Sequence, residues 1–203
     1  MTAKADIAKW DKAAKTFDKT SAVGVERRYG KVKQGLFAKA KGKILLVAAG
    51  TGKDFAYLPP GQDVVAVDFS RKMLEFAREK ISGYDGKLSL CQGDVQQLCM
   101  ADGVFDTIVT SCTFCSVPDP VKGLRELRRV LKPGGQLLMF EHVRAGNPLI
   151  GFMMDVMTPL ARIVGPDLNR KTWHNIKLAG FEITREYNVY LDVVKIYEAR
   201  PAS

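Results

Sequence analysis

Residues 43–68 read KILLVAAGTGKDFAYLPPGQDVVAVD, and this stretch decides the fold. An apolar run at 44–47 leads into small residues at 48–52, and a second apolar run at 64–67 ends at Asp68. Short apolar runs bounded by turn residues are typical of buried strands, and the small residues indicate a tight turn. We therefore predict a strand, a turn, a short helical segment and a second strand.

The turn and Asp68 have the properties of a nucleotide site. Gly50 and Gly52 let the backbone pass close to a ligand because glycine has no Cβ atom. A carboxylate at the carboxyl end of the next strand can accept hydrogen bonds from both hydroxyls of a ribose. We expect Asp68 to hold that ribose.

The same turn resembles the first motif of the class I S-adenosylmethionine (AdoMet) dependent methyltransferases, in which an acid precedes G-x-G-x-G. Leu46 stands where the family often has the acid, and Ala48 replaces the first glycine. Alanine is tolerated at that position if its φ angle stays negative.

Later segments continue the resemblance from residue 44 to residue 143, in the family's order and spacing. They are Gly93-Asp94-Val95, Phe105-Asp106 and the LKPGG sequence at 131–135. The resemblance implies a Rossmann-like α/β fold with helices on both faces of a seven-stranded, mostly parallel sheet. The sheet would end in a C-terminal antiparallel hairpin.

The alternation of strand and helix patterns along the chain agrees with a parallel sheet. Ser70 is a plausible N-cap of a helix that ends near 82–83, and Pro159 interrupts the apolar segment 148–164. The remaining expected elements are strands at 88–91, from 105, and at 136–143, a helix at 121–131, and hairpin strands at 181–189 and 192–200.

The resemblance also implies the cofactor, which is AdoMet, and the product S-adenosylhomocysteine. No metal is expected. The residues expected to bind the cofactor are Phe17, Ala48, Gly50, Thr51, Gly52, Asp68, Phe69, Met73, Gly93, Asp94, Val95 and Ser111. Asp94 would bond the adenine amino group, and the backbone of the following residue would read the ring.

Charge divides the chain into a basic N-terminal part, residues 1–42, and an AdoMet-binding domain, residues 43–203. Residues 1–43 hold twelve basic and four acidic residues, a balance of +8, against 19 basic and 18 acidic residues downstream. Ile7, Trp10, Ala14 and Phe17 form one helical stripe. Such a helix either lies on an anionic membrane surface or packs on the domain as a lid with a solvated basic face.

Composition sets further limits. A chain of 203 residues suits one domain, and it has no run of about 18 apolar residues that would predict a membrane span. We therefore expect a cytoplasmic monomer that associates peripherally with membranes. The four cysteines make no disulfide framework, and Cys112 and Cys115 are interpreted as core residues rather than as a redox or zinc pair.

Several segments resemble a narrower group, which contains bacterial phosphatidylethanolamine N-methyltransferases, ubiquinone and menaquinone biosynthesis methyltransferases, and membrane-associated thiol methyltransferases. The segments are 113–120, 141–144, 168–173 and 179–181. The family's signatures for nucleic-acid amino methylation and for covalent attack on pyrimidines are missing after the fourth strand, so we do not expect a nucleic-acid substrate. The group's substrates are mostly amphipathic, which predicts a lipid or another hydrophobic small molecule as the acceptor.

Candidate catalytic residues are few. His142 is the leading base because its ordinary pKa is about 6.5, although it could instead only orient the following loop; Tyr29 could contact a head group. Residues expected to bind the substrate are Cys115, His142, Asp155, Arg170 and Trp173. The apolar segment around Met153, Met154 and Met157 is interpreted either as a core helix or as the wall of a channel for a hydrophobic substrate.

The leading hypothesis is therefore an AdoMet-dependent methyltransferase that N-methylates phosphatidylethanolamine at an anionic membrane surface. The enzymatic alternative is methylation of a small thiol or a quinone precursor. The segment from Trp10 to Asp18 resembles the group's aromatic-Asp entrance motif, but Phe17 stands where a tyrosine is common. A non-enzymatic alternative, an AdoMet-binding scaffold, draws on this departure and on those at Leu46 and Ala48.

Overall fold

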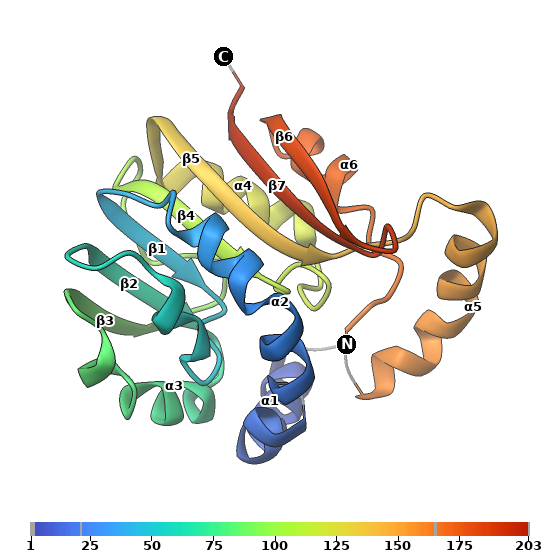
Figure 1. Ribbon diagram of the computed structural model, residues 1–203, viewed down its shortest axis with the longest axis horizontal. Helices are drawn as coiled ribbons and strands as arrows, with labels where there is room; N and C mark the ends of the chain where they lie inside the picture. The colour runs from blue at the N-terminus through green and yellow to red at the C-terminus, as the bar shows by residue number, and fades with distance from the viewer. Residues whose placement is uncertain (1–2, 21, 165, 203) are drawn as a thin grey trace.

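The structure is a computed structural model that describes residues 3–20, 22–164 and 166–202. Its centre is a seven-stranded sheet in the order β3-β2-β1-β4-β5-β7-β6 (Figure 1). The strands are β1 (Lys43–Val47), β2 (Asp63–Asp68), β3 (Lys87–Gln92), β4 (Phe105–Ser111), β5 (Leu131–His142), β6 (Phe181–Tyr190) and β7 (Val194–Pro201). The first five run parallel, and β7 pairs antiparallel with both β5 and β6, which confirms the predicted fold class.

Helices cover both faces of this sheet. In Figure 1, α2 (Ala22–Phe37) and α3 (Arg71–Arg78) lie on one face, and α4 (Pro120–Val130) and α6 (Thr172–Leu178) lie on the other. The helix α1 (Ala3–Thr20) packs against α3, and α5 (Pro148–Val164) extends away from the sheet. Among the described residues, no helix is both long and apolar enough to cross a lipid bilayer.

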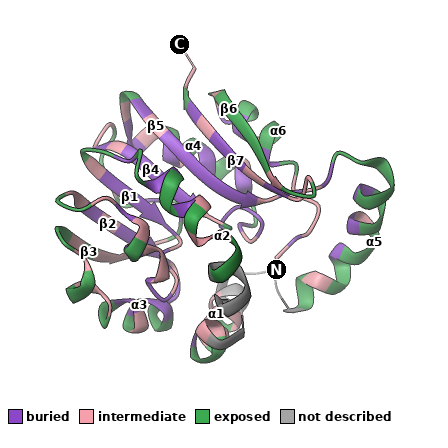
Figure 2. Cartoon of the chain, in the orientation of Figure 1, coloured by how far each residue is buried: buried purple, intermediate pink, exposed green. Residues whose placement is uncertain are grey.

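The apolar runs of the central strands fold as predicted because both of their faces are buried. Leu45 and Val47 of β1 join the core under α4 and α6, whereas Ile44 and Leu46 join the core under α2 and α3. Figure 2 shows the central strands almost entirely buried, while the helices are buried on one side only. Leu46, which stands where the family often has an acid, is 1% exposed and packs in this core.

Several element boundaries differ from the expectations. Ser70 caps α3 as predicted, but α3 ends at Arg78, and a separate 3-10 turn follows at Ile81–Gly83. The strand β5 begins at Leu131, because that residue already pairs with Phe105 of β4. Pro159 does not interrupt α5, which continues through it to Val164. Since proline has no N–H group, the helix gives up only the bond that this group would donate to the carbonyl of Asp155.

The condition under which alanine is tolerated at position 48 is not met, because the φ angle of Ala48 is +56°. The turn is fixed on both sides of this residue: the N–H of Ala49 donates to the carbonyl of Val67, and the N–H of Gly52 donates to the carbonyl of Ala49. The backbone therefore keeps the left-handed conformation that a glycine would adopt freely. For alanine this conformation costs roughly 1–2 kcal/mol.

We expect Ala48→Gly to stabilise the protein by about 0.5–1 kcal/mol, because the relieved strain exceeds the conformational entropy that glycine loses on folding. Urea unfolding in the absence of AdoMet measures this change. Ala49→Gly is the matched control: Ala49 is 6% exposed and has no positive φ, so its replacement should destabilise the protein. An unfolding midpoint of Ala48→Gly at or below that of the wild type would contradict the strain.

Candidate cofactor and methyl-transfer site

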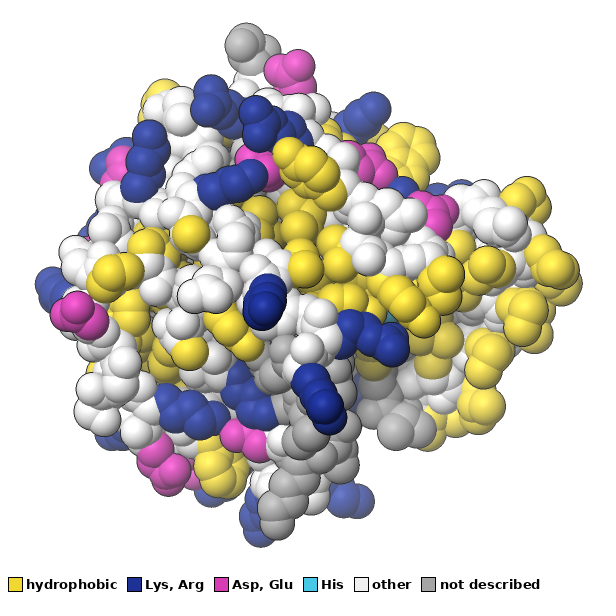
Figure 3. All heavy atoms as spheres, in the orientation of Figure 1, with side chains coloured by type: hydrophobic (Ala, Val, Ile, Leu, Met, Phe, Trp, Pro, Cys, Tyr) yellow, Lys and Arg dark blue, Asp and Glu magenta, His cyan; other side chains and the backbone are white. Residues whose placement is uncertain are grey.

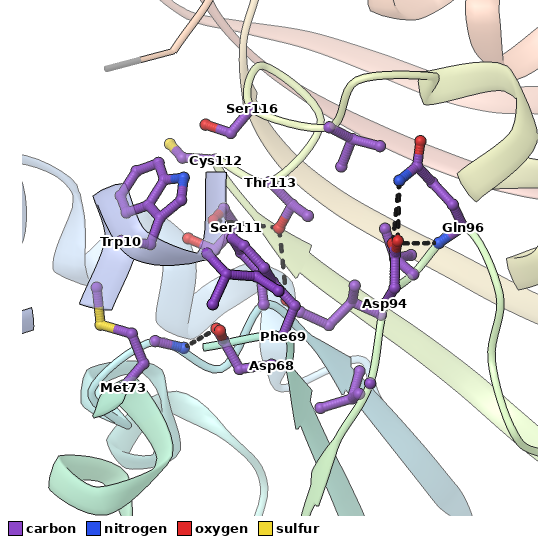
Figure 4. A pocket seen from close by; sticks show the side chains of 18 of the residues that line it. Trp10, Asp68, Phe69, Met73, Asp94, Gln96, Ser111, Cys112, Thr113 and Ser116 are labelled. Carbon is purple, nitrogen blue, oxygen red and sulfur yellow. Dashed lines mark hydrogen bonds between the residues drawn. The ribbon is translucent and has the colours of Figure 1, made fainter. Parts of the chain in front are cut away.

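A cavity of about 210 Å³ lies at the carboxyl ends of β1, β2 and β4, beneath α1 (Figure 4). Ten of the twelve residues expected to bind the cofactor line it. They are Phe17, Ala48, Gly50, Asp68, Phe69, Met73, Gly93, Asp94, Val95 and Ser111. The structure thus gathers residues from five separate segments of the sequence around one site.

The glycines of the turn have different roles. A Cβ atom on Gly50 would meet no atom closer than 3.9 Å, so the backbone of Gly50 faces open cavity that a ligand can fill. A Cβ atom on Gly52 would lie 2.7 Å from the ring of Phe55 and 3.1 Å from Cα of Ala77. Gly52 therefore allows the turn to pack against α3, and it does not itself face the ligand.

Asp68 is held at the cavity wall by hydrogen bonds that leave lone pairs of its carboxylate available. Its Oδ2 accepts from the N–H of Gly50 at 2.8 Å, and its Oδ1 accepts from the N–H of Ser70 at 2.9 Å. Burial raises the pKa of Asp68 to about 6, although these hydrogen bonds favour the ionised form. Each carboxylate oxygen has a second lone pair, so the group can still accept two ribose hydroxyls.

The expected adenine end of the cavity contains one residue that the sequence analysis missed. Asp94 is exposed, and its Oδ1 accepts from the backbone N–H of Gln96 at 2.8 Å. The Gln96 amide donates to the same carboxylate and accepts from the N–H of Asp119 at 3.0 Å. Gln96 therefore orients Asp94 and ties it to the start of α4.

The helix α1 covers the cavity. Ile7, Trp10 and Phe17 line the cavity, so the apolar stripe predicted for a membrane interface faces the cofactor site instead. The helix is fastened by two carboxylates: Asp11 accepts from the hydroxyl of Ser70, and Asp18 accepts from the hydroxyl of Thr51. In this structure, α1 therefore lies where a lid would lie, and its contact with a membrane remains a prediction.

Asp18 also pairs with lysines of the domain. Its carboxylate lies 2.9 Å from Nζ of Lys80 and 3.7 Å from Nζ of Lys53, and these contacts lower its pKa despite partial burial. The sequence analysis did not assign this role to Asp18. A spacing in the sequence could have indicated this role. Asp11 and Asp18 are seven residues apart, and so are Trp10 and Phe17, and this spacing places each pair on one side of a helix.

The loop after β4 closes the other end of the cavity and is fixed by Glu141. The carboxylate of this fully buried residue accepts from the hydroxyl of Thr110 at 2.7 Å and from the N–H groups of Thr113 and Phe114 at 3.3 and 3.1 Å. Burial raises the pKa of Glu141 to about 7. Glu141 thus positions the segment that lines the methyl-transfer cleft, a role that the sequence analysis did not assign.

The two cysteines of this loop differ from each other. Cys115 is buried as expected, and its thiol donates to the carbonyl of Cys112 at 3.2 Å. Cys112 is not a core residue, because it is open to the cavity and has a φ angle of +50°. Burial of the surrounding region raises the pKa of both thiols, that of Cys115 to about 12. Among the described residues, no group of side chains suits a metal ion.

The candidate catalytic residues lie apart from the described lining of the cavity. Partial burial lowers the pKa of His142, which is therefore neutral at pH 7, and its Nδ1 is buried without a partner among the described atoms. The ring of Tyr29 packs between Phe140 and Tyr190, at centroid distances of 5.5 and 6.4 Å. The catalytic roles of both residues remain predictions.

The other residues expected to bind the substrate are dispersed. Arg144 holds Asp155 through three hydrogen bonds of 2.8–3.2 Å and keeps the pKa of that carboxyl at about 2. Arg170 pairs with Asp167 at 2.8 Å and donates to the carbonyl of Val117. Trp173, 45% exposed on α6, contacts the ring of His174. Two of these three side chains are therefore already engaged in internal ion pairs.

Comparison with known proteins agrees with the fold. Residues 45–139 match the family described as a methyltransferase domain. The chain is 32% identical to the human thiol S-methyltransferase TMT1B, over 76% of this chain and 69% of that protein. It is 29% identical to the demethylmenaquinone methyltransferase of Clavibacter sepedonicus, over 96% of this chain and 90% of that protein.

A solved structure shares the fold. A SAM-dependent methyltransferase from Aquifex aeolicus shares the fold with a TM-score of 0.69 and 20% identity, over 93% of this chain and 97% of that chain. The chain belongs to the class I AdoMet-dependent methyltransferases. AdoMet is its methyl donor, and S-adenosylhomocysteine is the product.

We expect AdoMet affinity to fall about tenfold between pH 7 and pH 5. The ribose hydroxyls donate to the ionised carboxylate of Asp68, whose pKa is about 6, so roughly one-tenth of the protein is competent at pH 5. Asp68→Asn should weaken binding by about 1.5–3 kcal/mol and remove most of the pH dependence. Calorimetry at pH 5, 6 and 7 measures both effects. If the affinity of Asp68→Asn for AdoMet still fell steeply between pH 7 and pH 5, a group other than Asp68 would be responsible for the pH dependence.

We expect Asp18→Asn to make AdoMet dissociate about two- to fivefold faster, because a partly exposed carboxylate contributes about 0.5–1 kcal/mol to closing α1. Stopped-flow displacement measures the rate. Glu75→Gln is the matched control, since Glu75 pairs with Arg71 and Lys72 on α3 without fastening α1. Equal dissociation rates for Asp18→Asn and the wild type would show that the lid does not depend on these pairs.

Proposed function

We propose that the protein transfers the methyl group of AdoMet to the sulfur of an apolar thiol. The observation that carries this proposal is the chemistry of the loop after β4, which lines the expected methyl-transfer cleft. The described residues of this loop that line the cavity next to β4 are uncharged: Ser111, Cys112, Thr113 and Ser116. The carboxylates of the lining, Asp68 and Asp94, lie where the cofactor is expected.

A thiol is the acceptor that demands least from such a site. Its ordinary pKa is about 8.5, so a useful fraction is ionised in neutral water without a base from the protein. AdoMet supplies an activated methyl group together with its own leaving group. The sulfur forms the new bond to the methyl carbon as the old sulfonium bond breaks, and the thiol proton has already passed to water.

The chain's own residues then position the reactants and exclude water. Trp10 and Phe17 close the cavity from the side of α1, and Glu141 holds the loop on the opposite side. Cys112 faces the same cavity, but the raised pKa of its thiol keeps it protonated and therefore a weak nucleophile. The acceptor thiolate is thus the strongest nucleophile near the methyl group.

Phosphatidylethanolamine, the acceptor favoured by the sequence analysis, receives less support. A zwitterionic head group requires charged partners, and the two candidates for that role are engaged: Asp155 with Arg144, and Arg170 with Asp167. The relatives described above are named for thiol and quinone substrates. Methylation of the phospholipid amine remains a prediction that the assay below includes.

A quinone precursor is the second candidate. The observation that favours it is the demethylmenaquinone methyltransferase, whose match spans nearly the whole chain. A phenolic acceptor has an ordinary pKa of about 10 and needs a base near the site. His142, neutral at pH 7, is the base predicted from the sequence, although it lies apart from the described lining of the cavity.

The test uses labelled AdoMet with a series of aryl thiols of different pKa, with a reduced quinone precursor, and with phosphatidylethanolamine vesicles. If the proposal is correct, thiols are methylated, and the midpoint of each pH–rate profile follows the pKa of the thiol used. His142→Ala should leave those midpoints unchanged. Transfer to the quinone or lipid alone, or a midpoint that stays constant across the thiol series, would overturn it.

A further inference from the structure

The helix α5 has its apolar face turned outward. Large apolar side chains that are 40–71% exposed define what we call the outer face of α5: Leu149, Ile150, Phe152, Met153, Val156, Met157, Leu160 and Ile163. At about 100° per residue, these positions cover an arc of roughly 160° around the helix. The expectation of a core helix was wrong, because Met154 is the only methionine of the three that is buried.

Polar contacts fix this orientation. On the inner side of α5, Asp155 accepts from Arg144 and from the side-chain amide of Asn169 at 3.0 Å, and Arg162 pairs with Asp167. A rotation of the helix that buried the outer face would turn Asp155 and Arg162 to water and leave Arg144 and Asp167 beside apolar side chains instead of these partners. An uncompensated buried charge is costly, so the outer face stays outward.

Positive charge borders the outer face. The Nζ of Lys9 donates to the carbonyl of Arg162 at 3.2 Å, which places α1 beside the carboxyl-terminal end of α5. Lys12 and Lys15 of α1 are exposed, whereas the carboxylates of Asp11 and Asp18 turn toward the domain. Figure 3 shows the apolar side chains of α5 and the basic side chains over α1 and α2 on the same side of the molecule.

We propose that the outer face of α5 inserts into the interface of an anionic lipid bilayer, while the lysines of α1 contact the lipid head groups. An apolar face flanked by lysines suits such a surface. A second copy of the chain fits it less well, because a two-fold interface would bring the two sets of lysines together. The helix lies in the plane of the interface, since its inner side stays bonded to the protein.

This docking surface is independent of which acceptor the enzyme methylates. The proposal also places the apolar membrane contact on α5, whereas the sequence analysis considered the apolar stripe of α1 for that contact. That stripe lines the cofactor cavity, so α1 contributes its charge and α5 contributes the apolar contact.

Flotation with phosphatidylglycerol–phosphatidylcholine vesicles tests the proposal. We expect wild-type protein to float with them and Phe152→Glu/Leu160→Glu to lose more than 90% of this binding. Leu191→Glu is the matched control, because Leu191 is similarly exposed, at 64%, in the turn between β6 and β7. Unchanged thermal unfolding and AdoMet affinity confirm that each variant is folded. Lys12→Glu/Lys15→Glu should reduce binding to anionic vesicles at low salt but leave binding to neutral vesicles unchanged.

Three outcomes would overturn the proposal. The wild type could fail to float with anionic vesicles, or the α5 variant could float as well as the Leu191→Glu control. Alternatively, sedimentation in lipid-free buffer could show a wild-type dimer that Phe152→Glu/Leu160→Glu converts to a monomer, and the partner on the outer face would then be a second copy. Thiol methylation without lipid is measured separately, so failure of the docking proposal and failure of the proposed reaction are distinguishable.

Discussion

The carboxylate of Asp68 joins the two turns on which the cofactor site depends. It accepts from Gly50 in the turn after β1 and from Ser70 at the start of α3, so the ends of two strands and one helix are held together by one side chain. This group is 5% exposed and makes no ion pair with the side chains that the structure describes, so its burial is only partly offset by backbone donors. The ligand's hydroxyls add the donors that the ionised form lacks. The site is therefore preorganised, and it gains stability when it is filled.

Sequence patterns predicted the sheet, because strands depend on features that are local in the chain, whereas the residues of the cofactor cavity were predicted from the resemblance to the class I methyltransferases. Apolar runs such as 44–47 and turns with small residues report directly on strands buried on both faces. The conformation of Ala48 escaped prediction, since hydrogen bonds from neighbouring residues to the rest of the turn fix it. The pairing of Asp18 with Lys80 also escaped, because 62 residues separate them.

The outward face of α5 shows a second limit of pattern analysis. Periodicity identifies which residues of a helix share a face, but it does not say what covers that face. The usual inference places the apolar face in the core. Here the few polar residues of the segment find partners on the protein side, with Arg144 holding Asp155. The direction of the helix was thus decided by ion pairs whose partners lie on other segments.

The fastening of α1 over the cavity has a consequence for turnover. S-adenosylhomocysteine differs from AdoMet only by the lost methyl group and its charge, so the contacts of Asp18 with Thr51, Lys53 and Lys80 retain the spent cofactor as firmly as the fresh one. Because these ion pairs are partly exposed to water, dissolved salt screens them. Product inhibition should therefore be strong in dilute buffer and weaken as ionic strength rises, and release of the product rather than methyl transfer would then limit the rate.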